Sequence, residues 1–131
     1  MLTKTITYTD FNGNTRTEDF YFNISRTEVI QNRNAIESFA KTANELSQTE
    51  DVTAAVKLVH DIVMLAFGKK SEDGKRFVKS DELCEEFEQS AAYEELLFGL
   101  LGSEKEMTEF VQGAIPKIDS ADPAAIKMAN A

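Results

Sequence analysis

Residues 8–24 read YTDFNGNTRTEDFYFNI, and this stretch decides the fold. Asp10 and Gly13 suit the first and last positions of a type I turn whose last residue is left-handed and forms a bulge, a conformation that glycine adopts at little cost. This turn pairs Asp10 with Asn14 and makes a β-hairpin. A two-residue turn at Asn12 and Gly13 is the alternative, and it would shift the register by one residue.

The bulged turn is preferred because it separates apolar from polar side chains. The two-residue turn would set Ile6 opposite Asp19 and would make the phenylalanines face threonines. Because a hairpin alone is only marginally stable in water, its apolar face predicts a covering layer of helices. In the preferred register one face carries Leu2, Ile6, Tyr8, Phe20, Phe22 and Ile24, and the other carries Thr5, Thr7, Thr17 and Asp19.

Helical patterns follow the hairpin. The segment Ser25–Glu28 fits a capping box, and a run of weak helix formers at Asn32–Asn34 predicts a break or kink. A central helix is expected after Asp51, and Gly68 is placed to end it in the left-handed conformation. Pro116 is expected to stop the last firm helix.

The remaining segments complete the predicted fold. Residues 69–79 are compatible with a short second hairpin or an ordered loop, and Ser80, Ser90 and Ser103 fit helix starts. We expect an α+β fold, mostly α, with an N-terminal two-stranded antiparallel hairpin packed on about five or six helices.

The domain prediction is a single domain over residues 1–116, with the hairpin at about 2–24 and the helical part at about 26–116. Residues 117–131 are small and polar and bury little apolar surface, so they are predicted to be a mobile tail.

The composition argues against nucleic acids and anionic membranes as partners. The 131 residues carry a net charge of −9, with a pI of about 4.6, so the phosphates of nucleic acids and anionic membranes would be repelled at long range. Cys84 is the only cysteine, the N-terminus has no apolar run like that of a signal peptide, and the longest apolar stretch, Ile62–Phe67, is too short to span a membrane. These features predict a soluble protein of a reducing compartment.

Two motifs that suggest a metal site or catalysis are better explained structurally. Asp10, Asn12, Asn14 and Glu18 resemble part of a calcium loop, but Thr15 stands where such a loop requires glycine. His60 is the only histidine, and its neighbour Asp61 is not expected to face it on a helix, so a boundary histidine is the simpler interpretation.

The charged clusters allow the same structural interpretation. Lys69 and Lys70 follow the negative end of the central helix, so they are expected to compensate its dipole, with Lys75, Arg76 and Lys79 in a solvated loop. The acidic run 81–88 is expected to be a solvated helix face. We therefore expect no catalytic, metal or cofactor site and no enzymatic activity.

Two blocks carry a resemblance to a known family. They are residues 7–23, TYTDFNGNTRTEDFYFN, and residues 67–93, which include FGKKSEDGKRFVKSDEL and FEQS. Together they resemble the tail assembly chaperones of long-tailed, siphovirus-type phages and prophages of Gram-positive bacteria. The likeness covers about residues 4–116 and is weaker over 32–50.

The resemblance implies a protein without catalysis that binds the tape measure protein and the tail tube subunits during tail assembly. It implies a location in the cytoplasm of the bacterial host and absence from the mature virion. In many such phages a ribosomal frameshift yields a longer second product, which a protein sequence does not reveal. The alternative is a structural virion protein, such as a tail completion or connector protein.

A chaperone of this kind needs apolar surface for its partner. Leu65, Phe77, Val78 and Phe98 lie off the main apolar stripes of their segments, so they are the candidate partner-binding residues. Self-association is compatible with the composition, but the sequence specifies no symmetry.

Overall fold

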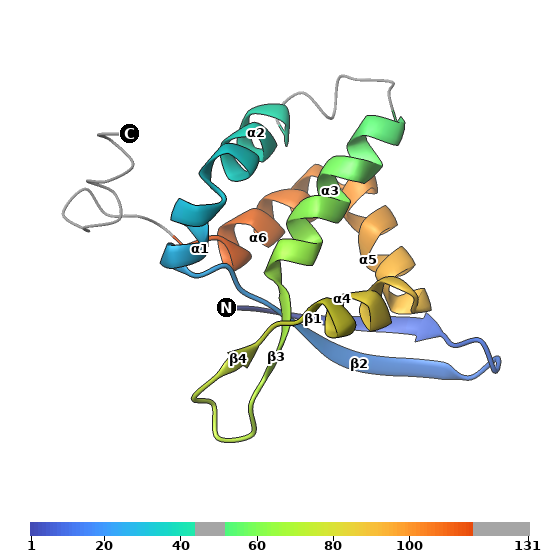
Figure 1. Ribbon diagram of the computed structural model, residues 1–131. Helices are drawn as coiled ribbons and strands as arrows, with labels where there is room; N and C mark the ends of the chain where they lie inside the picture. Colours follow the sequence, from blue (N-terminus) through green and yellow to red (C-terminus); the bar gives the residue numbers. More distant parts are fainter. Residues whose placement is uncertain (44–51, 117–131) are drawn as a thin grey trace.

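The structure, a computed structural model, describes residues 1–43 and 52–116. Within these ranges a sheet lies on one side of the molecule and the helices lie together on the other (Figure 1). The strands are β1 (Leu2–Thr9), β2 (Thr15–Phe22), β3 (Phe67–Lys70) and β4 (Phe77–Val78). The helices are α1 (Arg26–Gln31), α2 (Arg33–Ala43), α3 (Val52–Ala66), α4 (Asp81–Glu88), α5 (Ala91–Gly102) and α6 (Glu104–Ala114). The predicted α+β class, mostly α, is confirmed.

The N-terminal hairpin has the predicted register. The N–H of Asp10 donates to the carbonyl of Asn14 at 2.9 Å, and the N–H of Gly13 donates to the carbonyl of Asp10 at 3.0 Å. Gly13 has φ +82°, as the bulged turn requires. The polar face is as expected, with the Thr7 hydroxyl 3.0 Å from that of Thr17.

The hairpin is extended into a four-stranded antiparallel sheet of order β1-β2-β3-β4. The two-stranded hairpin was therefore only part of the sheet, because β3 pairs with β2 at Tyr21 and Phe22. β3 and β4 then pair with each other, so the segment after α3 forms the second hairpin rather than a loop.

The role predicted for Gly68 is wrong. Among the described glycines only Gly13 and Gly74 have positive φ, and Gly68 lies in β3 rather than in a left-handed helix end. Its lack of a side chain serves close packing instead. A Cβ at this position would lie 2.6 Å from the Phe77 ring and 2.8 Å from the carbonyl oxygen of Val78.

The helix boundaries follow local sequence signals. The capping box Ser25–Glu28 is present, and Asn32 separates α1 from α2 where the break was predicted. Ser80 and Ser103 accept hydrogen bonds from the N–H groups of their first helical turns. Ser90 precedes α5 but donates its hydroxyl to the carbonyl of Phe87 instead, so its predicted side-chain cap is absent.

A cluster of aromatic rings joins the sheet to the helices. Phe67 of β3 stacks on Phe87 of α4 with ring centroids 4.4 Å apart, and Phe22 of β2 meets Phe110 of α6 at 5.2 Å. Phe22 and Phe110 are fully buried. The hairpin and the helices therefore share one core.

Two predictions lie outside the described residues, namely the cap at Asp51 and the tail 117–131. The limits of the domain stay a prediction.

Candidate protein-binding surface

The tip of the hairpin is a hydrogen-bonded turn that presents an aromatic side chain. One carboxylate oxygen of Asp10 accepts hydrogen bonds from the N–H groups of Asn12 and Asn14, each at 2.9 Å, and the other accepts from Nε of Arg16 at 2.6 Å. The Arg16 guanidinium, followed by the Asn14 N–H, holds the pKa of Asp10 below its ordinary value. The hydrogen bonds of this carboxylate organise the turn, so they account for the acidic and amide residues there without a bound calcium ion.

Phe11 stands at the second position of this turn with 85% of its surface exposed. A large apolar side chain held in solvent by an ordered turn is a candidate anchor for a protein partner. Phe11 is not among the candidate residues proposed from the sequence. Its exposure could have been predicted from its place in the turn, because the second residue of a type I turn between two strands faces solvent whatever its polarity.

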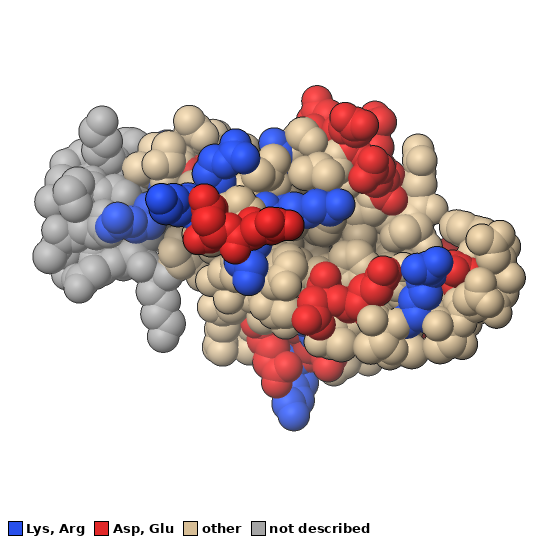
Figure 2. All heavy atoms as spheres, turned by 90° about the horizontal axis from the view of Figure 1, so that it is seen from below, with Lys and Arg blue, Asp and Glu red and all other residues tan. Residues whose placement is uncertain are grey.

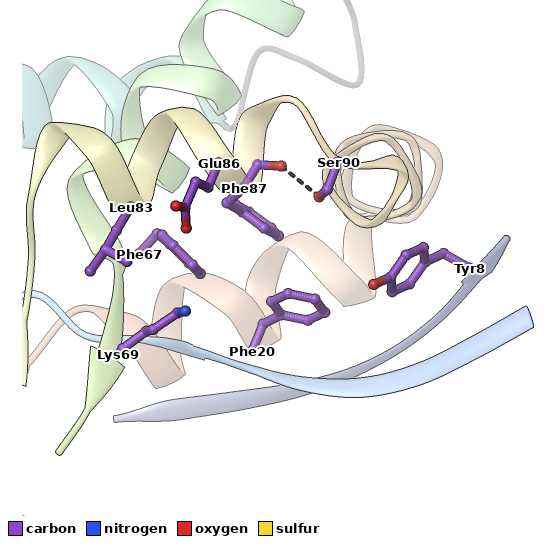
Figure 3. A pocket seen from close by; sticks show the side chains of 8 residues that line it. All are labelled: Tyr8, Phe20, Phe67, Lys69, Leu83, Glu86, Phe87 and Ser90. Carbon is purple, nitrogen blue, oxygen red and sulfur yellow. Dashed lines mark hydrogen bonds between the residues drawn. The ribbon is translucent and has the colours of Figure 1, made fainter. Parts of the chain in front are cut away.

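A small apolar hollow lies between the sheet and α4 (Figure 3). Phe20, Phe67 and Phe87 form its floor, while Lys69 and Glu86 bring charged groups of opposite sign to it. Its volume is about 140 Å³. Small-molecule sites usually measure roughly 300–1,000 Å³, so this hollow suits one or two inserted side chains rather than a substrate.

The four residues proposed from the sequence lie in two separate places. Leu65, near the end of α3, and Phe77 and Val78 of β4 are half-buried, whereas Phe98 of α5 is 60% exposed. β4 and α5 lie apart in Figure 1, so these residues do not form one patch. Phe98 is the one that has the exposure of a docking residue.

Phe98 has acidic neighbours on its helix. Glu94 and Glu95 lie one turn earlier on the same exposed side of α5, while Leu96, Leu97 and Leu100 are buried. The surface around Phe98 is therefore an aromatic ring bordered by carboxylates.

Lys79 binds the end of the central helix, a role that was expected of Lys69 and Lys70. Its ammonium donates to the carbonyl of Leu65 at 2.7 Å and pairs with the carboxylate of Glu28 at 2.7 Å. Lys69 and Lys70 lie in β3 with exposed side chains, and Lys70 stands 5.3 Å from the centre of the Tyr21 ring.

Basic and acidic side chains are mixed over the side of the molecule where the sheet lies (Figure 2). This view shows no broad surface of positive charge of the kind that holds a phosphate backbone.

His60 is a boundary residue, but the reasoning about its neighbour was wrong. Its Nδ1 lies 3.1 Å from a carboxylate oxygen of Asp61, and its Nε2 lies 3.0 Å from that of Glu88. The side chains of these adjacent residues therefore do reach each other on the helix. The described part of the chain contains no group of three or more His, Cys, Asp or Glu side chains arranged to hold a metal ion.

Comparison with known proteins identifies the family. The family model described as phage tail assembly chaperone matches residues 1–122. No curated protein and no solved structure matched the chain. Within the described residues no helix is long and apolar enough to cross a membrane. A role in tail assembly implies protein partners, which suits a surface with exposed aromatic side chains and a hollow of side-chain size. Because the match covers nearly the whole chain, the protein belongs to the phage tail assembly chaperone family.

Proposed function

We propose that this chaperone binds the tape measure protein of its phage and delivers tail tube subunits to it, without catalysis. The observation that carries the proposal is the family match over residues 1–122. A tape measure protein is long and helical, and such chains need apolar surfaces covered until the tube surrounds them. The chaperone would act in the cytoplasm of the bacterial host and would be absent from the mature virion.

Phe98 supports this proposal as a contact residue. An amphipathic helix of the partner would bury its apolar side against the exposed ring, as aromatic anchors do in helix recognition. Basic residues beside that apolar side would pair with Glu94 and Glu95, which are both exposed. The net charge of −9 would also favour partners of opposite charge.

Co-expression with the tape measure protein from the same phage tests the proposal. We expect the soluble fraction of the tape measure protein to rise and the two proteins to co-purify. If the tape measure protein precipitates regardless and the chain is found in purified virions, the proposal fails and a structural virion role replaces it.

The variant Phe98→Ser tests the contact. Because the ring is 60% exposed, its removal should leave the fold intact and should lower the amount of co-purified tape measure protein several-fold. Val52→Ser is the matched control, since Val52 is 64% exposed at the start of a different helix. Equal losses in the two variants would contradict a specific contact at Phe98.

A further inference from the structure

Within residues 1–43 and 52–116, no strand pairs with one edge of β2 along most of its length. β2 pairs with β1 over all eight of its residues, Thr15–Phe22, but with β3 only at Tyr21 and Phe22. β3 then turns away to pair with β4, so among the described strands none but β1 pairs with Thr15–Phe20, and we call this the open edge (Figure 1). An open edge presents backbone N–H and C=O groups that another strand can pair with.

The hairpin register shows which backbone groups face this edge. The pair Asp10 and Asn14 is hydrogen-bonded, and bonded and non-bonded pairs alternate along an antiparallel ladder. The backbone groups of Thr15, Thr17 and Asp19 therefore point away from β1. The direction agrees with Asn23, whose N–H donates to the carbonyl of Ala66 at 2.8 Å on this same side.

Charges along the edge are self-complementary about Thr17. If a second copy of β2 pairs antiparallel with Thr17 opposite Thr17, then Arg16 of each copy lies opposite Glu18 of the other. Moving the centre by one residue places Glu18 opposite Glu18 or Arg16 opposite Arg16. Opposite charges directly across a ladder are favourable and like charges are not, so the pattern selects one register out of three.

We propose that this edge of β2 pairs with the same edge of a second copy, forming a two-fold symmetric dimer with a continuous sheet. Such an interface is self-complementary, as two-fold symmetry requires. Pairing in this register covers Thr15–Asp19 in both copies. At its centre, the backbone N–H and C=O of Thr17 in one copy bond the C=O and N–H of Thr17 in the other.

A second hollow, distinct from the one between the sheet and α4, lies at the end of the open edge and supports the proposed dimer. It measures about 380 Å³ and is lined by residues of both β2 and β3, among them Phe20, Tyr21, Phe67 and Lys69. In the proposed register, Asn14 of the second copy lies opposite Phe20, so the hairpin tip of that copy reaches this hollow. Its Phe11, 85% exposed in the single chain, would be covered there.

Sedimentation of the full chain over concentrations from about 1 µM to about 1 mM tests the dimer. Only five residues pair on each strand, so a weak, concentration-dependent dimer is expected, in the range of transient interfaces. A chain that stays monomeric throughout would overturn the proposal and would leave the edge available to a strand of a different protein.

Charge variants test the register. Arg16→Glu and Glu18→Arg each place like charges opposite each other, so each should weaken dimerisation at least tenfold. The two variants mixed together should form a heterodimer, because opposite charges then meet at both positions. The double variant R16E/E18R should dimerise like the original chain. If the single variants dimerise as strongly as the original chain, the proposed register is wrong.

A pair of proline variants tests the edge independently of charge. Thr17→Pro removes an N–H that points to the open edge of β2, and Thr7→Pro removes its counterpart on the outer edge of β1. Both variants keep the β1–β2 hydrogen bonds and both lose the Thr7–Thr17 hydroxyl contact. Only Thr17→Pro should abolish the dimer. Equal behaviour of the two variants would overturn the proposal.

Discussion

At the scale of single residues, Gly68 and Gly99 differ in whether the structure has room for a side chain. Gly68 lets β4 pack directly on β3, because its absent Cβ makes room for the Phe77 ring and the Val78 carbonyl. Gly99 lies inside α5, where a Cβ would meet nothing within 4 Å.

Gly68→Ala should therefore destabilise the protein by about 1–3 kcal/mol, since the new methyl group overpacks a contact that includes backbone. Gly99→Ala should stabilise it by about 0.5–1 kcal/mol through helix propensity. Urea unfolding followed by circular dichroism measures both. A Gly68→Ala chain with an unchanged midpoint would contradict the close packing of β4 on β3.

At the scale of elements, a half-buried charged contact ties three segments together. Lys79, between β4 and α4, reaches Glu28 of α1 and the carbonyl of Leu65 in α3. Partial burial is the largest influence on the pKa of Glu28 and raises it, but the hydrogen bonds from Lys79 and Ser25 outweigh it. The pKa of Glu28 therefore lies below its ordinary value of 4.5.

This contact should make stability depend on pH in acid. A lowered folded pKa means that the stabilisation is complete above about pH 4.5 and is lost as the pH falls through the folded pKa. Glu28→Gln should cost about 1 kcal/mol near pH 7, after discounting for partial exposure, and should flatten the acid dependence. Glutamine also fits the capping box, so the change isolates the charge.

Chemical denaturation at a series of pH values measures the effect. Glu72→Gln is the control, because Glu72 is exposed in the turn between β3 and β4. If Glu28→Gln and Glu72→Gln give the same pH profile, the Lys79 contact does not contribute to stability.

At the scale of the whole molecule, the aromatic cluster makes the sheet and the helices one cooperative unit. Phe22 contacts rings from β3, α4 and α6, namely those of Phe67, Phe87 and Phe110. Without these helices to cover its apolar face, the hairpin would be at best marginally stable in water.

Phe22→Ala should cost about 3–5 kcal/mol and should lower the unfolding temperature of sheet and helices together. Phe11→Ala is the matched control, because it removes the same ring from an exposed turn and should change stability by less than about 0.5 kcal/mol. Thermal unfolding monitored by circular dichroism and by tyrosine fluorescence tests this prediction. Two separate transitions would contradict a single domain over residues 1–116.

The sequence by itself determined the local structure. Gly13 and Asp10 set the turn and hence the register, because this register puts Leu2, Ile6, Tyr8, Phe20 and Phe22 on one face. Ser25 and the weak helix formers after it placed α1 and the break at Asn32, because caps and propensities act over a few residues. The family resemblance rested on the same continuous segments.

Only the tertiary structure decided what depends on distant segments. The pairing of β3 with β2, the true role of Gly68 and the contact of Lys79 with Glu28 join residues far apart in the chain, and local patterns carry no information about such meetings. The candidate surface divides in the same way. Phe98 could be chosen from its helix position, but the open edge of β2 exists only because β3 leaves it after two residues.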